Sequence, residues 1–206
     1  VFGVERAIHI YLDIVHSIYK IVKNIIDVSL IISYNKSPKN PDLTWLDSDD
    51  PGFLEIRKEE IQDRAVSSAI LAADAGAKKI ILLSTLSPAI KKEWIEQAFN
   101  MISDKNIVLG PTKEGGCYLL GFSPAGIRIL ENLDMNRQEM IDEISEKSKR
   151  LKLSVQTLPE TYVVWDEESL REWVDSREQK IPFAEKTHIE KVHRKKLNHN
   201  HHETVQ

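Results

Sequence analysis

The chain has 206 residues, which is enough for one domain of ordinary size with a buried hydrophobic core, or for one domain with a tail. Its 28 basic and 32 acidic residues give a net charge of −4. The two signs are mixed along the sequence, which argues against a nucleic-acid-binding protein because such proteins normally carry a basic face.

A single cysteine excludes an internal disulfide framework and is typical of a reducing cytosol. No apolar run reaches the length of a membrane span, and the first residues lack the basic and then apolar order of a signal peptide. We therefore expect a cytoplasmic protein that binds neither membranes nor nucleic acids. The sequence allows oligomers and does not define their size.

Apolar residues recur every three or four positions between residues 4 and 26, which predicts a long amphipathic helix. His9 and His16 lie seven positions apart in this helix. Because no third ligand with metal-site spacing is near them in the sequence, we interpret both as solvated or boundary residues. Residues 28–33 follow, and their branched side chains predict a buried strand.

A polar loop is predicted for residues 34–52, where Asn, Asp, Ser and Pro are frequent. Residues 55–75 return to helical spacing with small residues on one face, and Gly76 is placed to end this helix. Four branched aliphatic residues in a row at Ile80–Leu83 then predict a strand that is buried on both faces.

The stretch from Lys78 to Phe122 predicts, in order, a strand, a loop, a helix, a strand, a loop and a strand. Its two loops, Ser84–Pro88 and Gly110–Gly116, open at the carboxyl ends of adjacent predicted strands. Ligands of open α/β sheets bind at this edge. The stretch is therefore the predicted location of a functional site.

Four further elements complete the predicted fold. They are a short helix at 124–131 with Ser123 as its N-cap, a charged helix at 136–151, an exposed strand at 153–158 and a helix at 167–177. The order of elements predicts a three-layer α/β/α fold around a mostly parallel sheet. We assign residues 1–180 to one domain and residues 181–206 to a polar, flexible tail.

The predicted site carries two matches to a known family. Gly110-Pro111, followed by Glu114-Gly115-Gly116-Cys117-Tyr118-Leu119-Leu120-Gly121, resembles the Gly-Pro and Asp-Gly-Gly-Tyr-Tyr-Leu-Ile-Gly of transferases with the nucleotide-diphospho-sugar transferase (GT-A-like) fold. Ser84-Thr85-Leu86-Ser87-Pro88 resembles their Gly-Ser-Asp-Cys-Pro loop. These are the glycosyltransferases associated with radical-SAM or selenium-related domains, relatives of the molybdenum-cofactor and phospholactate nucleotidyltransferases.

The resemblance implies a nucleotide or nucleotide-sugar ligand, and Mg²⁺ or Mn²⁺ as cofactor if the protein is active, because such a transferase must neutralise a diphosphate. This chain departs from the implied metal site. Leu86 stands where the family has its metal-binding Asp, and the late carboxylate positions hold Val163, Trp165 and Ser169. Asp166 is a candidate to replace them in a shifted register, and it is also a candidate N-cap of the next helix.

The family pattern also has a first strand that ends in a basic, glycine-containing loop. In this sequence the predicted first helix begins within a few residues of Val1. Either the protein has lost these elements or the numbering begins inside a longer protein. We accordingly expect a GT-A-like fold that lacks its first strand.

The loop Gly110–Gly116 retains the family pattern best. We predict that Gly110, Pro111, Glu114, Gly115 and Gly116 bind the nucleotide or sugar, because adjacent glycines let a ligand approach the backbone. Glu114 and Asp166 are the candidate catalytic residues. The alternative is that Gly115 and Gly116 only form a turn, with Glu114 in solvent. Cys117 has no paired His in the sequence pattern, which argues against a catalytic thiol.

Two functions are consistent with these residues. One is a glycosyl- or nucleotidyltransferase-like protein that uses a nucleotide-activated donor, with reduced or lost activity. The alternative is a catalytically inactive protein that binds a ligand or partner on the same scaffold, with apolar Leu86 and Trp165 filling the former metal site. A flavodoxin-like or Rossmann-type binder also fits the element order, but it predicts a glycine-rich turn after the first strand, which this sequence lacks.

Overall fold

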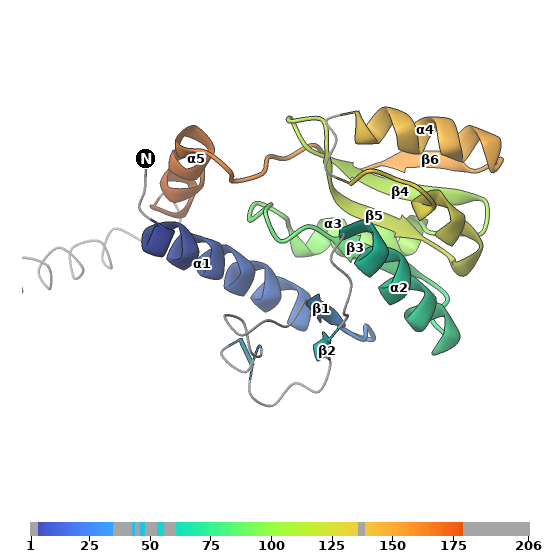
Figure 1. Cartoon of the computed structure of the whole chain (residues 1–206), viewed down its shortest axis with the longest axis horizontal. Coiled ribbons are helices and arrows are strands. Elements are labelled where there is room, and N and C mark those ends of the chain that lie inside the picture. The colour runs from blue at the N-terminus through green and yellow to red at the C-terminus, as the bar shows by residue number, and fades with distance from the viewer. Residues whose placement is uncertain are drawn as a thin grey trace, which may run out of the picture. The chain divides into compact units, whose positions relative to one another are not determined.

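A mixed four-stranded sheet forms the centre of the larger unit in the computed structural model of the chain (Figure 1). The structure describes residues 4–34, 43, 46–47, 53–55, 61–135 and 139–178. The chain divides into two compact units at the peptide bond between Val164 and Trp165. The predicted tail at 181–206 lies outside the described residues.

The sheet has the strand order β3-β5-β4-β6. Its strands are β3 (Ile80–Leu83), β4 (Asn106–Pro111), β5 (Cys117–Phe122) and β6 (Ser154–Thr157). β5 pairs antiparallel with β3 and β4, whereas β4 pairs parallel with β6. Three strands thus run in one direction and β5 runs against them. The expected mostly parallel sheet is corrected to a partly parallel one, because the short turn between β4 and β5 reverses the chain, whereas parallel neighbours need a long crossover.

The position of β3 also differs from the prediction. β5 lies between β3 and β4, so the two strands that precede the predicted loops are not adjacent. β3 is an edge strand of this sheet. Ile80 is buried, but the other three residues of β3 are only half-buried, so burial on both faces is wrong for most of the strand. An apolar run predicts a strand but does not by itself place it at the centre of a sheet.

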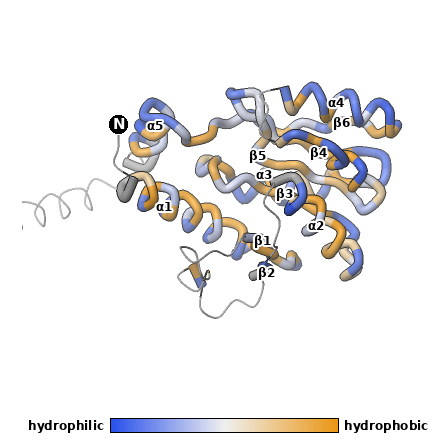
Figure 2. Tube along the Cα trace, viewed as in Figure 1, coloured by the Kyte–Doolittle hydropathy of each residue, from blue (hydrophilic) through white to orange (hydrophobic). Residues whose placement is uncertain are grey.

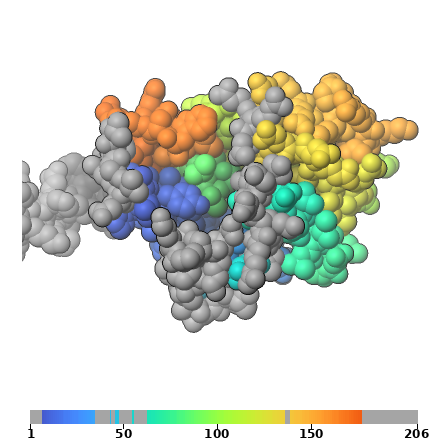
Figure 3. All heavy atoms as spheres, viewed as in Figure 1, coloured from blue at the N-terminus to red at the C-terminus, as the bar shows by residue number. Residues whose placement is uncertain are grey.

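Helices cover both faces of the sheet, as a three-layer fold requires. On one face lie α2 (Ile61–Asp74), the 3₁₀-helix η1 (Pro124–Leu130) and α4 (Met140–Arg150). Their buried side chains form one core with those of the strands, which includes Ala69, Ile80, Ile107, Leu109, Leu120, Phe122, Ile129, Leu130, Met140 and Ile144. The strands are mostly apolar, whereas α4 is largely hydrophilic (Figure 2). The helices η1 and α4 contact each other and form a continuous part of the surface (Figure 3).

The opposite face is covered by α3 (Lys92–Met101). Gly121 points to this face, because strand residues alternate and its neighbours Leu120 and Phe122 belong to the other core. A Cβ atom on Gly121 would lie 2.8 Å from Ile102, the residue that ends α3. The absence of a side chain at Gly121 therefore allows α3 to approach the sheet closely.

The amino-terminal part of the larger unit contains α1 (Val4–Lys23) and a small parallel pair of strands, β1 (Ile32–Tyr34) and β2 (Phe53–Glu55). The long amphipathic helix is confirmed, and its buried residues include Ile14, Ile18, Tyr19 and Val22. β1 overlaps the predicted strand at 28–33 only at Ile32 and Ser33, and its residues are half-buried, so the prediction of a buried strand there is wrong for most of its length. A helix from residue 55 is wrong, because Glu55 ends β2 and α2 begins at Ile61.

The end of α2 follows the predicted chemistry. Gly76 has a φ of 94°, in the left-handed region that favours glycine. The Gly76 N–H donates to the Ala73 carbonyl (2.9 Å), and the Ala77 N–H donates to the Ala72 carbonyl (3.0 Å). This pair of hydrogen bonds is the Schellman arrangement that ends many helices. Gly76 therefore directs the chain from α2 into β3.

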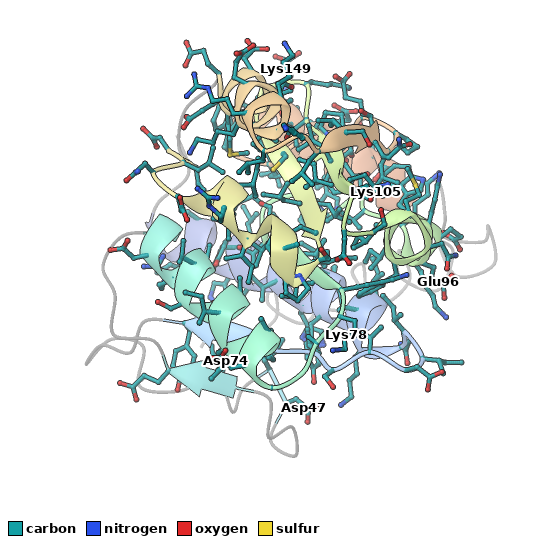
Figure 4. All side chains as sticks on the ribbon, turned by 90° about the vertical axis from the view of Figure 1, so that its right-hand side faces the viewer. Asp47, Asp74, Lys78, Glu96, Lys105 and Lys149 are labelled. Carbon is teal, nitrogen blue, oxygen red and sulfur yellow. The ribbon has the colours of Figure 1, made fainter. Side chains whose placement is uncertain are left out.

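The remaining described helix, α5 (Glu167–Glu178), belongs to the second unit. Among the described residues, no helix combines the length and apolar character needed to cross a membrane. Charges of both signs lie at the surface: Asp74, Lys78, Lys105 and Lys149 are exposed, and Figure 4 shows them pointing outward from the sheet together with Glu96.

Candidate functional site

Three segments lie at the end of the sheet where β3, β4 and β6 finish. They are the loop after β3 (residues 84–91), the hairpin turn between β4 and β5 (residues 112–116) and the segment after β6 (residues 158–164), which we call the post-β6 segment. Because β5 is antiparallel to β3 and β4, it begins at the same end (Figure 1). The structure therefore brings both predicted loops to one edge of the sheet.

The hairpin turn is closed by hydrogen bonds within itself. The Thr112 N–H donates to the Gly116 carbonyl (2.9 Å), and the Gly115 N–H donates to the Thr112 carbonyl (3.0 Å). Gly115 has a φ of 86°, which disfavours any side chain. A short turn that ends with glycine in the left-handed region is a common connection in β-hairpins. The turn alone therefore explains Gly115.

The post-β6 segment pairs with the hairpin turn. The Thr161 N–H donates to the Pro111 carbonyl (3.1 Å), and the Lys113 N–H donates to the Thr161 carbonyl (2.9 Å). Two residues later, the Val163 N–H donates to Oε2 of Glu114 (3.3 Å). Glu114 is thus half-buried against the post-β6 segment, and the prediction that it lies in solvent if the glycines form a turn is wrong.

The same segment also contacts the loop after β3. The Val164 N–H donates to the carbonyl of Leu86 (2.8 Å). The Leu86 N–H in turn donates to Oγ of Ser84 (3.2 Å), and the neighbouring Thr85 hydroxyl is 3.3 Å from the hydroxyl of Tyr11 in α1. The post-β6 segment therefore links the hairpin turn to the loop after β3.

A β-bulge interrupts the pairing of β4 with β5. Gly110 is opposite Leu119, whereas Pro111 is opposite Cys117, so Tyr118 is an extra residue on the β5 side. A bulge changes the direction of the side chain at the extra residue and bends the strand. The bulge therefore sets where the Tyr118 ring lies.

The ring of Tyr118 is fully buried and packs against the backbone of Gly110. A Cβ atom on Gly110 would lie 2.7 Å from both Cε atoms of the ring. The ring centroid is 5.8 Å from that of Trp94 in α3, and the hydroxyl donates to the carbonyl of Pro159 (3.0 Å). Burial raises the pKa of Tyr118 above its ordinary value, so the hydroxyl stays protonated as a donor. Gly110 is therefore explained by packing.

Gly116 is the glycine of the turn that neither conformation nor packing requires. Its φ is not in the left-handed region, and the nearest atom to a Cβ there would be the Thr112 Oγ1 atom at 3.5 Å, an ordinary contact distance. Thr112 is 3% exposed, and its hydroxyl has no hydrogen-bond partner among the described residues. Buried hydroxyls without a partner are rare in proteins and call for an explanation.

Sequence reasoning missed Thr112, since a lone threonine in a loop gives no signal of its own. It also missed Ser87 in the loop after β3, which is fully buried and whose hydroxyl likewise has no partner in the part of the chain that the structure describes. The signal for both residues is burial, which becomes visible only in three dimensions.

Asp166 forms the amino-terminal cap of α5. The Ser169 N–H donates to Oδ1 of Asp166 (2.9 Å), and the Ser169 hydroxyl donates to the same oxygen (2.6 Å). The side-chain bond and then the backbone bond from Ser169 lower the pKa of the Asp166 carboxyl. The capping role suggested by the sequence is thus realised. Asp166 belongs to the second unit, whereas Glu114 belongs to the first.

The described residues contain no cluster of metal-binding side chains that would hold Mg²⁺ or Mn²⁺ without a ligand. No three His, Cys, Asp or Glu side chains of the described ranges come together in a position to hold a metal ion. Leu86 has no oxygen ligand to offer, and divalent ions of this kind prefer carboxylate and phosphate oxygens. Leu86 is 36% exposed and Trp165 is 60% exposed. The hypothesis that these two side chains fill a former metal site is therefore not supported, because neither is buried.

Cys117 lies at the start of β5, and its side chain is half-buried. Burial removes water from the thiol and raises its pKa from 9.0 to about 12. A thiol with so high a pKa carries almost no thiolate near neutral pH, and the thiolate is the nucleophile. Cys117 is thus unsuited to nucleophilic catalysis.

Residues 26–137 match the protein family DUF2064, described as "Uncharacterized protein conserved in bacteria". The match covers more than half of the 206 residues. The chain belongs to the DUF2064 family. Comparison of this DUF2064 protein with curated protein sequences finds no match.

Solved structures resemble this DUF2064 protein in fold. A "putative nucleotide-diphospho-sugar transferase" from Desulfovibrio desulfuricans G20 matches with a TM-score of 0.69 and 22% identity, covering 80% of this chain and 72% of that one. A 4-diphosphocytidyl-2C-methyl-D-erythritol synthase matches with a TM-score of 0.54 and 10% identity, covering 77% and 86% of the two chains.

A third similar structure is CMP:2-keto-3-deoxy-manno-octonic acid synthetase complexed with CTP, with a TM-score of 0.52, 11% identity and coverage of 82% and 88%. At these identities the likeness establishes a shared fold. The DUF2064 protein therefore shares the mixed α/β fold of nucleotide-diphospho-sugar transferase structures.

The two glycines at the ends of the predicted site should differ in their tolerance of a methyl group. Gly110→Ala should lower the free energy of unfolding by about 1–3 kcal/mol, because the new Cβ overlaps the Tyr118 ring. Gly116→Ala should change it by less than about 0.5 kcal/mol, because the atom nearest to the new Cβ would lie at an ordinary contact distance. Urea denaturation of both variants measures the difference. Equal destabilisation would contradict the packing assigned to Gly110.

The pKa of Asp166, measured by NMR from its carboxyl chemical shift, should lie below the ordinary value of 3.8. Because the folded pKa is lowered, the cap should stabilise α5 at pH values above 3.8, and this contribution should be lost as the pH falls through the folded pKa. Ser169→Ala should move the pKa towards 3.8. Ser176→Ala, later in the same helix, serves as the control and should leave it unchanged.

Cys117 should react slowly with iodoacetamide in the folded protein. With a pKa of about 12 instead of 9.0, alkylation at pH 8 should be on the order of 1,000-fold slower than in urea-unfolded chain. Because the pKa of the thiol is raised in the folded protein, the protonated thiol should make its full contribution to the free energy of unfolding below pH 9. This contribution should be lost as the pH rises towards 12. Mass spectrometry measures the rate, with Cys117→Ser as the blank. Fast alkylation of folded protein would refute the burial effect.

Proposed function

We propose that this chain is a transferase-like protein that binds a nucleotide-activated donor, a nucleotide or nucleotide sugar, at the loop edge of the sheet. The scaffold is that of nucleotide-diphospho-sugar transferases and nucleotidyltransferases, one of which was solved with CTP. Ligands of α/β sheets bind at the carboxyl ends of the strands, where the hairpin turn and the loop after β3 lie.

The observation that carries the proposal is Gly116 beside Thr112. Packing explains Gly110, and the turn explains Gly115, but neither explains Gly116. A glycine in a turn lets a ligand approach the backbone closely, because it carries no side chain. The buried Thr112 hydroxyl oxygen would lie 3.5 Å from a Cβ atom on Gly116, and it has no hydrogen-bond partner within the described ranges. These two features together support a binding site at the turn.

The second candidate is a catalytically inactive binding protein on the same scaffold. It is favoured by the contacts of the two candidate catalytic carboxylates, which both have structural partners. Glu114 accepts a hydrogen bond from the Val163 N–H, and Asp166 caps α5. Leu86 supplies no metal ligand. We therefore propose donor binding as the function and derive no transfer step through Mg²⁺ or Mn²⁺. Transfer activity, if present, would be reduced relative to an enzyme with the family's carboxylates.

A place among the glycosyltransferases associated with radical-SAM or selenium-related domains rests on the sequence resemblance. Mixed surface charge, visible around Lys78 and Lys105 in Figure 4, supports a small-molecule ligand over nucleic acid. A cytoplasmic location and assembly into oligomers are likewise proposals from the sequence.

Isothermal titration calorimetry with UDP-glucose, GDP-mannose, ADP-glucose and CTP tests the proposal, each with EDTA and with Mg²⁺ or Mn²⁺. We expect at least one ligand to bind in EDTA. Gly116→Ala should weaken that binding about tenfold, because the methyl group occupies the approach to the backbone. Ser154→Thr, which adds a methyl group at an exposed position of β6, is the control.

The outcomes separate the candidates. Absence of binding by every ligand would refute donor binding. Binding that Gly116→Ala leaves unchanged would place the site elsewhere. Turnover of a bound nucleotide sugar would favour the transferase over the inactive binding protein. A strict requirement of binding for Mg²⁺ or Mn²⁺ would contradict the proposal that Glu114 and Asp166 serve structural roles and that donor binding needs no metal ion.

A further inference from the structure

The backbone N–H groups of the hairpin turn are mostly used inside the protein. Those of Thr112, Lys113 and Gly115 donate to carbonyl groups of Gly116, Thr161 and Thr112 at 2.9–3.0 Å. A glycine-rich loop that binds phosphate does the opposite, because it directs several free N–H groups at the anion. The turn at residues 112–116 is therefore not built as a phosphate loop, although it contains two adjacent glycines.

The charges of the turn also disfavour an anion. Glu114 places a carboxylate on the turn, with Oε2 accepting the Val163 N–H. The ammonium group of Lys113 lies 5.6 Å from the ring centroid of Tyr162. One positive and one negative side chain leave the turn without excess positive charge, and a carboxylate repels a phosphate at short range. Glu114 can instead accept a hydrogen bond from a neutral hydroxyl group through its second oxygen, Oε1.

The Thr112 hydroxyl supplies the complementary group. Thr112 is 97% removed from solvent, its Oγ1 atom would lie 3.5 Å from a Cβ atom on Gly116, and its hydroxyl can both donate and accept a hydrogen bond. A hydroxyl group of a ligand is matched by such a partner without any net charge. The turn thus offers an acceptor at Glu114 and a donor and acceptor at Thr112, next to a backbone position without a side chain at Gly116.

We propose that Thr112, Glu114 and Gly116 form a subsite for the hydroxyl groups of a sugar ring, and that the phosphates of the donor lie elsewhere. This inference rests on the proposed function, since the ring is part of the nucleotide-activated donor. The ring is either the ribose of the nucleotide or the sugar that is transferred. Both present adjacent hydroxyl groups, so the chemistry at the turn is the same, and the experiment separates the two sources.

The test is a ¹H–¹⁵N NMR titration of the whole chain with D-ribose, D-glucose and inorganic pyrophosphate in separate arms. Concentrations on the order of 100 mM are needed, because fragments of this size bind weakly. Ribose or glucose should shift the amide signals of Thr112, Glu114 and Gly116. A shift with ribose alone assigns the nucleoside ring, and a shift with glucose alone assigns the transferred sugar. Signals that move with pyrophosphate and with neither sugar, or with none of the three, overturn the subsite.

Thr112→Val adds an affinity measurement with a control for folding. The substitution keeps the shape of the side chain and removes the hydroxyl, so sugar affinity should fall about five- to tenfold. Stability should stay equal or rise, because the hydroxyl has no protein partner in the described ranges. Thr157→Val at an exposed position of β6 should change neither quantity. Unchanged sugar affinity in Thr112→Val overturns the role of the hydroxyl.

Failure of this inference differs from failure of the proposed function. If the nucleotide ligands bind in calorimetry and Thr112→Val leaves both their affinity and the sugar shifts unchanged, donor binding stands and the sugar subsite is wrong. If no nucleotide ligand binds but ribose or glucose still shifts the Gly116 signal, the subsite stands and the assignment of its ligand to a nucleotide-activated donor is wrong.

Discussion

The packing of the Tyr118 ring against the backbone of Gly110 is the contact on which the loop edge of the sheet depends. The ring is fully buried at a bulge in β5, where it also meets Trp94 of α3. Its hydroxyl bonds the carbonyl of Pro159, at the start of the post-β6 segment. One side chain thus joins two strands, a helix and the segment that contacts both loops. Interior packing of this density leaves no room for a side chain at Gly110.

This contact changes the meaning of the glycine pattern that the chain shares with nucleotide-diphospho-sugar transferases. Gly110 and Gly121 give space to Tyr118 and to Ile102, and Gly115 provides a left-handed turn residue. Most of the pattern therefore records how the strands pack, which is why it identifies the fold. Gly116 is the one glycine of the pattern that these structural roles do not explain. Fewer residues of the pattern are therefore available for ligand binding than the length of the match suggests.

The sequence predicted the elements well where periodicity was strong, as in α1, and where turn chemistry was specific, as at Gly76. It failed on the direction of β5, because buried parallel and antiparallel strands have similar apolar residues. The available signal was the short turn before Cys117, which is too short for a crossover. It also failed on Leu86 and Trp165, since an apolar side chain does not have to be buried.

The candidate site was predictable in position but not in chemistry. Strand ends and adjacent glycines located the edge, and the structure confirms that the two loops share it. The partners of Glu114 and the burial of the Thr112 hydroxyl depend on where the post-β6 segment lies. The post-β6 segment is almost fifty residues away from the hairpin turn in the sequence, since Val163 and Glu114 are 49 residues apart. No local pattern encodes a contact of that range.

The post-β6 segment also has a thermodynamic consequence. It is hydrogen-bonded through Thr161 to the hairpin turn and through Val164 to the loop after β3, only three residues apart. A displacement of either loop must strain or break bonds of the same short peptide. A ligand that displaced one loop through this segment would also act on the other loop, and linkage would make that influence equal in both directions. Two molecules that each displaced their loop would then bind as a coupled pair.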